Sequence, residues 1–306
     1  MSEKIIRIGT RDSELALWQA HNVQQKINDL GVKTEIISVK SEGDLQLNSP
    51  LYELGITGIF TKTLDIAMLN GTIDIAVHSM KDVPTALPSG IIQGAVLERA
   101  SENDILIHKN NLSFLQHSGT VATGSLRRQA QWLNKYPSHT IVDLRGNVNL
   151  RLTKLNQSTW NGAIFAAAGL ERINLKPDYF VNLDWMTPAP AQGAMVVLTM
   201  ANDSFCNDVV SELNHLESDI CTYIERQFLR TLEGGCTAPI GALCKIIDDD
   251  IYFKGNLLSI DGRQKIEIEK TVALQDWKKL GFNLAQEILH NGGTKLMAEI
   301  KDSLKK

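Results

Sequence analysis

The chain lacks long apolar runs, a secretory signal and an excess of basic residues, and each absence argues against one class of protein. No run of about 18 apolar residues occurs, so we expect no membrane-spanning helix. The first residues, MSEKIIR, contain neither an extended apolar stretch nor a small-residue cleavage site, which argues against a secretory signal. The net charge of -4 argues against a general nucleic-acid binder, because such proteins normally carry a basic excess.

Cysteine is also scarce, and its spacing excludes two further classes. The four cysteines lie in the C-terminal third without any CxxC pair, at Cys206, Cys221, Cys236 and Cys244. This spacing fits neither a disulfide framework nor a structural zinc site. We therefore expect a reduced, cytoplasmic protein that binds no metal.

Apolar residues are frequent enough for a substantial core, and the length suggests two or three domains. Hydrophobic residues make up 43% of the 306 positions, and a domain typically contains about 100–200 residues. Apolar periodicity predicts strands at 5–9, 32–39 and 73–77, and helices at 15–27 and 59–69. This alternation favours a parallel or mixed sheet that is covered by helices.

The alternation begins again further along the chain, which predicts a second α/β lobe. Strands are predicted at 105–107, 120–122, 141–144 and 163–167, and helices at 125–134 and 147–155. We expect a cleft between the two lobes. The glycine-containing segment 41–58 has little periodicity, and a loop of that length is typically a functional lid or disordered.

The last third has a different pattern, which predicts a small α+β domain. A helix through Tyr223 is followed by the helix-stop signal Gly234–Gly235. Strands are predicted at 240–247, 251–258 and 265–272, and a closing helix at 277–289.

Arginines follow several predicted strands at the point where each strand ends. In TGSLRRQ (123–129), Ser125 is a candidate N-cap, and Arg127 and Arg128 fall in the first helical turn, where the helix dipole disfavours cations. A bound anion would remove this conflict, because helix N-termini attract negative charge. The alternative is a pair of solvated arginines on a surface helix.

The same layout recurs at two other strand ends. In DLRGNV (143–148), Arg145 precedes a turn at Gly146 and Arg151 follows in the next helix, and Arg11 comes directly after the first strand. Ligands of open α/β sheets bind beyond the carboxyl ends of the strands. The arginines together therefore predict one site for a polyanion whose carboxylates or phosphates the guanidinium groups bind.

The segment HSMKDVP (78–84) brings a carboxylate to the same kind of position. The strand before it delivers Ser79, Lys81 and Asp82 to its carboxyl end. A carboxylate among arginines stays ionised and could stabilise a cation or relay a proton. A local ion pair between Lys81 and Asp82 is the alternative, and we interpret His78 as a hydrogen-bonded core residue.

The segment LEGGCTAPIG (232–241) places Cys236 on a glycine-flanked loop. A thiolate there could act as a nucleophile. No histidine is close in sequence to activate it, so an inert thiol remains the alternative.

Five segments in order resemble the porphobilinogen deaminase family, and the resemblance runs nearly from end to end. They are IGTRDSELALWQA (8–20), AVHSMKDVP (76–84), GSLRRQ (124–129), LRGNV (144–148) and LEGGCTAPIG (232–241). The resemblance implies a transferase, hydroxymethylbilane synthase, that condenses four porphobilinogen molecules with loss of ammonia and then releases linear hydroxymethylbilane by hydrolysis. Its place would be tetrapyrrole (haem) biosynthesis.

The resemblance also implies a role for each matching residue. Cys236 would carry a dipyrromethane cofactor through a thioether bond, and Asp82 would be the catalytic residue that hydrogen-bonds the pyrrole nitrogens. Cofactor contacts would also come from Ser79, Lys81, Thr123, Ser125, Arg127, Arg128, Arg145, Gly146 and Arg151. Substrate contacts would come from Arg11, Ser13, Phe60, Arg172 and Gln192. The implied protein is a monomer with a small-molecule substrate and no nucleic-acid, membrane or metal partner.

The implied fold consists of two periplasmic-binding-protein-like (type II) lobes with mixed sheets flanking a cleft, plus a small α+β C-terminal domain. Lobe one would comprise 1–98 with 194–212, lobe two 99–193, and the cysteine domain 213–306. The chain departs from the family pattern near the lid and one cleft wall. Basic residues are common where it has Glu42 and Thr57, glycine where it has Ile56 and Ala191, and glutamate where it has Leu198.

Two other functions fit part of the pattern. A non-catalytic two-lobed binding protein for small anions would explain the arginines but would give Cys236 and the third domain no role. A cysteine-nucleophile acyl transferase would need an oriented base and an oxyanion hole, for which the sequence contains no signal.

Overall fold

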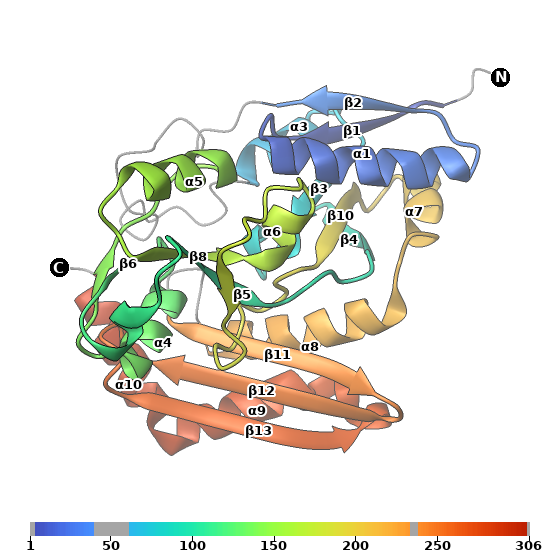
Figure 1. Ribbon diagram of the computed structural model, residues 1–306. Helices are drawn as coiled ribbons and strands as arrows, with labels where there is room; N and C mark the ends of the chain where they lie inside the picture. The colour runs from blue at the N-terminus through green and yellow to red at the C-terminus, as the bar shows by residue number, and fades with distance from the viewer. Residues whose placement is uncertain (1–3, 40–60, 233–237, 305–306) are drawn as a thin grey trace.

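The computed structural model describes residues 4–39, 61–232 and 238–304, whose strands form three sheets (Figure 1). Two are mixed five-stranded sheets flanked by helices, and the third is a three-stranded antiparallel sheet. This arrangement confirms the predicted fold class of two α/β lobes and a small α+β domain. Cys236, Phe60 and the predicted lid 41–58 lie outside the described residues.

The sheet of lobe one has the strand order β2-β1-β3-β10-β4. Its strands are β1 (Ile6–Thr10), β2 (Thr34–Ser38), β3 (Ile75–Ser79), β4 (Ile91–Val96) and β10 (Met195–Met200). Strands β1, β2 and β3 are parallel, whereas β10 is antiparallel to both β3 and β4. The chain therefore returns from lobe two to complete the sheet of lobe one.

Helices cover both faces of this sheet because its residues alternate between the faces. The helices are α1 (Glu14–Asp29), α3 (Lys62–Leu69) and α7 (Ser204–Ser211). Val23 and Ile27 of α1 pack with Ile75 and Val77 of β3, whereas Ala76 packs on the α3 side. Each valine or isoleucine side chain among them contributes about 1.5–3 kcal/mol when it is fully buried.

The sheet of lobe two has the strand order β7-β6-β8-β5-β9. Its elements are β5 (Asp104–His108), η2 (Ser113–Gln116), β6 (Thr120–Ala122), α4 (Leu126–Lys135), β7 (Thr140–Val142), α5 (Val148–Gln157), β8 (Gly162–Ala166), α6 (Ala167–Glu171) and β9 (Phe180–Asn182). Strand β7 ends at Val142 rather than at the predicted Leu144, so Arg145 lies in the loop before α5.

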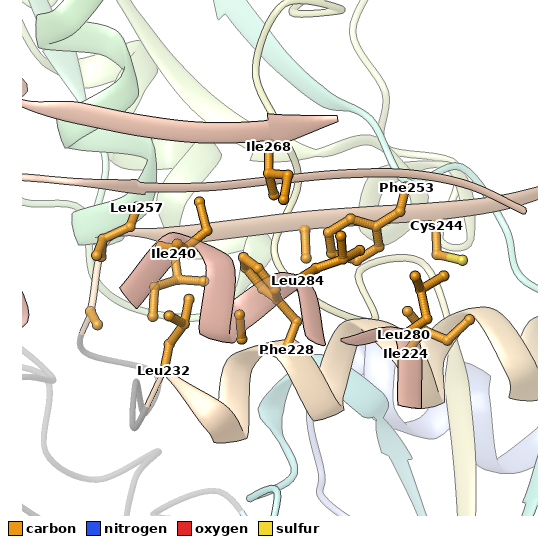
Figure 2. Close-up of a cluster of buried hydrophobic side chains, with 14 of the residues drawn as sticks. Ile224, Phe228, Leu232, Ile240, Cys244, Phe253, Leu257, Ile268, Leu280 and Leu284 are labelled. Carbon is orange, nitrogen blue, oxygen red and sulfur yellow. The ribbon is translucent and has the colours of Figure 1, made fainter. Parts of the chain in front are cut away.

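The described part of the C-terminal α+β domain, called domain three below, combines the third sheet with three α-helices and two short helical segments. Its elements are α8 (Leu216–Thr231), β11 (Ile240–Ile247), β12 (Asp250–Leu258), β13 (Lys265–Ala273), η3 (Leu274–Lys279), α9 (Leu280–Ile288), η4 (Leu289–Gly293) and α10 (Thr294–Ser303). Figure 2 shows its core, in which Phe228 of α8 packs against Phe253 of β12 with the ring centroids 5.2 Å apart.

The predicted closing helix at 277–289 is wrong at its start, and it is not the last helix of the described chain. The chain forms a 3₁₀ helix up to Lys279, and α10 follows α9 although no helix was expected there. Gly292 has φ 102°, a left-handed conformation that glycine adopts without steric cost and that bends the chain between the two helices.

Two segments, 97–103 and 183–194, connect the lobes and run side by side. The N–H of Leu97 donates to the carbonyl of Met195 (3.1 Å), and the N–H of Ala100 donates to the carbonyl of Gly193 (3.2 Å). Gly193 has φ 88°, and a Cβ atom there would lie 2.5 Å from the Ala100 carbonyl oxygen. Only glycine therefore fits this close approach without a backbone shift.

A buried ion pair ties this double connection to α8, which lies between β11 and β4 (Figure 1). Arg99 contacts Glu225 through Nη1–Oε1 (2.7 Å) and Nη2–Oε2 (3.1 Å), and its Nε donates to the Gln192 carbonyl (2.8 Å). Glu225 is fully buried and also accepts the backbone N–H of Ala191 (2.6 Å) and of Cys244 (2.7 Å). One carboxylate thus joins the inter-lobe connection to domain three.

We predict that Arg99→Leu lowers the free energy of unfolding by about 3–5 kcal/mol, because it leaves the Glu225 carboxylate buried without a counter-charge. Urea denaturation measures the effect. The matched control is Lys4→Ala, which removes an exposed pair with Asp203 (2.8 Å) and should cost less than about 1 kcal/mol. Equal costs for the two variants would contradict the importance given to the buried pair.

Candidate functional site

The carboxyl ends of β1 and β3 bring the lobe-one residues of the predicted site together. The two strands are parallel neighbours, so the chain leaves both at the same edge of the sheet. Arg11, Ser13, Ser79 and Asp82 line one recess there, with a volume of about 70 Å³. Gln19 of α1 donates to the Ser79 hydroxyl (2.9 Å) and so fixes one wall.

His78 lies in β3 and lines the same recess. Burial, together with the charge of Arg11, lowers the pKa of His78 to about 4, so its imidazole is neutral at neutral pH. The predicted core position is confirmed by its 6% exposure. The hydrogen bonding predicted with it is not found at Nε2, which has no hydrogen-bond partner among the described residues.

Arg127 and Arg128 lie in the first turn of α4, the helix that follows β6. Ser125 is the N-cap of this helix, as predicted, and its hydroxyl accepts the backbone N–H of Arg128 at 3.4 Å. The two arginines are only 5% and 6% exposed. The alternative of solvated arginines on a surface helix is therefore wrong.

A buried carboxylate outside all the sequence motifs compensates these two charges. Asp104, the first residue of β5, is fully buried and lies 2.7 Å from Arg127 Nη1 and 2.7 Å from Arg128 Nη2. Burial opposes ionisation of Asp104, but the two guanidinium groups outweigh it and hold the pKa of this carboxyl well below its usual range. The protein itself thus supplies part of the negative charge predicted at the α4 terminus.

Gln192 connects this cluster to lobe one. Its side chain is fully buried. Its Nε2 atom donates hydrogen bonds to Asp104 Oδ1 (3.0 Å) and to the Glu102 carbonyl (2.8 Å). Its Oε1 atom accepts a hydrogen bond from Lys81 Nζ (3.3 Å).

Burial and the Arg128 charge lower the pKa of Lys81 to about 8, although Asp82 and Asp104 oppose the change. Within the described ranges no ion pair joins Lys81 to Asp82, so that alternative is wrong.

Arg145 and Arg151 come from the loop after β7 and the helix that follows it. Arg151 Nε donates to the Gly146 carbonyl (2.7 Å). Burial and the Arg128 charge lower the pKa of Arg151 to about 10, and Asp82 opposes this shift. Arg151 of lobe two is therefore within electrostatic reach of Asp82 of lobe one.

Two guanidinium nitrogens in this region are left without an acceptor. Arg145 is 5% exposed, and its buried Nη1 has no hydrogen-bond partner in the described part of the chain; the same holds for Nε of Arg127. Buried donors are normally paired, and ionised donors bind carboxylates or phosphates with short, strong bonds. The residues present therefore fit a ligand that carries carboxylates.

Thr123 and Arg172 lie beside this region. Thr123 Oγ1 accepts the backbone N–H of Ser125 (3.3 Å). Arg172 Nη2 donates to the Gly193 carbonyl (2.7 Å), and its guanidinium lies 5.7 Å from the ring centroid of Trp18 in lobe one. Arg172 thus contacts the inter-lobe connection, whereas the roles predicted for Cys236 and Phe60 stay predictions.

Two of the departures from the family pattern fall on described residues. Ala191 has φ 61°, and this left-handed conformation costs a residue with a Cβ atom about 1–2 kcal/mol, which explains why glycine suits the position. Leu198 is 1% exposed in the lobe-one core beside α3. Its predicted place at a cleft wall is therefore wrong.

Two kinds of feature outside this region of the described chain were candidates for another site, a larger hollow and a metal cluster. A larger hollow of about 550 Å³ lies at the opposite edge of the lobe-one sheet, beside Ile5 and residues 31–35, and holds none of the predicted residues. No cluster of three or more His, Cys, Asp or Glu side chains in the described ranges could hold a metal ion. None of the helices described is long and apolar enough to span a membrane.

Comparison with known proteins gives matches over nearly the whole chain. The family model "Porphobilinogen deaminase, dipyromethane cofactor binding domain" matches residues 6–208, and "Porphobilinogen deaminase, C-terminal domain" matches 220–290. The porphobilinogen deaminase of Carboxydothermus hydrogenoformans is 37% identical over 305 residues, 98% of each chain. That of Chlorobium phaeobacteroides is 36% identical, over 98% of this chain and 99% of its own.

Solved structures give a weaker match. The VFT2 domain of Bordetella pertussis BvgS is 11% identical over 68% of this chain and 86% of that domain, with a TM-score of 0.42.

Lys81 should make stability depend on pH in a defined direction. Its pKa is about 8 in the folded protein and about 10.4 in an unfolded chain. Between these values the unfolded state binds more protons, so the contribution of Lys81 to stability rises with pH. In urea denaturation the wild type should gain stability relative to Lys81→Met between about pH 7 and about pH 10. A stability difference that stays constant over this range would refute the shifted pKa.

Proposed function

The chain belongs to the porphobilinogen deaminase family, and on this premise we propose that it is a hydroxymethylbilane synthase of tetrapyrrole biosynthesis. Such an enzyme condenses four porphobilinogen molecules head to tail onto a covalently bound dipyrromethane primer, with loss of ammonia, and then releases linear hydroxymethylbilane by hydrolysis. The observation that carries the proposal is the set of buried arginines with unpaired donors, on Arg127 and Arg145, at the lobe-two side of the site.

The chemistry of the substrate explains why so many cations are gathered. Every porphobilinogen carries an acetate and a propionate, so the growing chain is a dense array of carboxylates. Arg127, Arg145 and Arg151 would bind the cofactor carboxylates, together with Arg128, which Asp104 and the Ile164 carbonyl hold in place. When bound at Cys236, dipyrromethane would supply the pyrrole carbon to which the first unit is joined, and each later unit would join the end of the growing chain.

We assign the catalytic role to Asp82. Its carboxylate lines the recess with Arg11 and Ser13 and would accept hydrogen bonds from the pyrrole N–H groups of the substrate. The loss of ammonia leaves positive charge on that substrate. A fixed carboxylate at hydrogen-bond distance stabilises this developing charge without reorganisation, which is the form of catalysis that contributes most in many enzymes.

The other polar residues would orient the ligands. Lys81, held by Gln192, is largely protonated at neutral pH with a pKa of about 8 and would bind a cofactor carboxylate, with Ser79, Thr123, Ser125 and Gly146 adding polar contacts. The substrate would contact a second set of residues: Arg11, Ser13, Phe60, Arg172 and Gln192.

The proposal includes the domain boundaries and the state of the protein. Pairing of β10 with β3 and β4 supports the assignment of 194–212 to lobe one with 1–98, which leaves 99–193 as lobe two and 213–306 as the cysteine domain. By family analogy the protein would be a cytoplasmic monomer. The net charge of -4 supports the absence of a nucleic-acid partner.

The intact mass of the denatured protein tests the proposed function. Protein purified from cells able to make porphobilinogen should exceed its sequence mass by two condensed pyrrole units, and Cys236→Ser should lack this excess. If added porphobilinogen does not add the two pyrrole units to unmodified wild-type protein, the proposed deaminase function is wrong. The favoured function is then a non-catalytic binding protein for small anions.

Asp82→Asn tests the catalytic assignment. The variant should keep the primer and the fold, but its kcat should fall by about 100-fold or more, because an amide cannot stabilise the developing cation as a carboxylate does. The matched control is Asp208→Asn on exposed α7 surface, which should retain full activity. Near-normal turnover of porphobilinogen by Asp82→Asn would remove the assigned role.

A further inference from the structure

The turn that carries Lys81 and Asp82 is held by a side chain from domain three. Arg226 of α8 donates from Nη1 to the carbonyls of Val83 (2.8 Å) and Met80 (3.2 Å), and from Nη2 to the carbonyl of Pro84 (2.7 Å). We infer that Arg226 is a positioning residue for Asp82, an inference that rests on the proposed function.

The turn needs such support because it is too short to hold itself. The 3₁₀ helix η1 spans only Met80–Asp82, and its closing bond runs from the Val83 N–H to the Met80 carbonyl (3.2 Å). Single 3₁₀ turns have poor hydrogen-bond geometry. The Met80 N–H donates to the Ala194 carbonyl (3.0 Å), which fixes the start of the turn to lobe one. Arg226 fixes the end.

The side chain suits this task because a guanidinium is planar and presents several donors in a fixed arrangement. It contacts carbonyls on both sides of Asp82 and so holds the backbone before and after this residue. Lysine carries the same charge but concentrates its donors on one nitrogen at the end of a flexible stem. A lysine therefore cannot reproduce the three bonds with the same geometry.

The helix that carries Arg226 is itself fixed. Glu225, the preceding residue, holds Arg99 and the inter-lobe connection, and Phe228 packs in the domain-three core (Figure 2). Domain three also contacts α4 of lobe two, because Asn134 donates to the Gly262 carbonyl (2.7 Å). One rigid domain therefore sets the catalytic turn of lobe one and the arginine helix of lobe two relative to each other.

Arg226→Gln and Arg226→Lys test the inference in the holoenzyme. In both variants kcat should fall about tenfold or more, because a small displacement of a catalytic group lowers the reaction rate strongly. The kcat value is calculated per mole of enzyme that carries the primer, which intact mass measures. KM for porphobilinogen should change less than about twofold, because the groups that bind carboxylates stay in place. The matched control is Arg230→Gln, an exposed arginine on the same helix, which should match the wild type.

Hydrogen–deuterium exchange gives a readout that does not depend on activity. The backbone amides of residues 80–83 should exchange faster in Arg226→Gln than in the wild type, while the amides of α8 stay protected. The inference is overturned if exchange at 80–83 is unchanged, or if kcat stays within about twofold of the wild type. If Arg226→Gln does not fold, Arg226→Lys decides by the same criteria. If the wild-type protein does not consume porphobilinogen, the proposed function is wrong. Hydrogen–deuterium exchange would still show whether Arg226 positions the turn.

Discussion

The buried carboxylate of Asp104 is the constraint on which the arginine side of the site depends. It holds Arg127 and Arg128 at 2.7 Å each and, through Gln192, reaches Lys81 of the opposite lobe. A buried ion cluster of this kind adds little net stability, because desolvation offsets the attraction. Its value here is geometric, since it fixes two guanidinium groups before a ligand arrives and leaves Nε of Arg127 free to bind one.

Domain three imposes the second constraint, and α8 is the element that transmits it. Glu225 and Arg226 are adjacent, yet one holds the connection between the lobes and the other holds the turn before Pro84. Cys236 follows soon after this helix in the sequence. The helix that leads to the proposed attachment cysteine therefore also contacts the backbone on both sides of Asp82, the proposed catalytic residue.

Local pattern predicted most of the strands, the Ser125 N-cap and the gathering of arginines, because periodicity, capping and strand direction are encoded by neighbouring residues. Asp104 could not be predicted in the same way. An aspartate before a strand is equally well explained by turn chemistry, and its partners lie more than 20 positions away. The roles of Glu225 and Arg226 depend on contacts between segments that only the tertiary fold brings together, as does the core position of Leu198.

The most direct test of this account is kcat/KM for porphobilinogen in the Asp104→Asn holoenzyme. Asparagine keeps the shape of the side chain but removes the charge that holds both guanidinium groups. The account predicts a fall of about 100-fold, because misplaced binding groups lose the productive geometry. A kcat/KM within about twofold of the wild type would show that the arginines are ordered without Asp104 and would contradict the central claim.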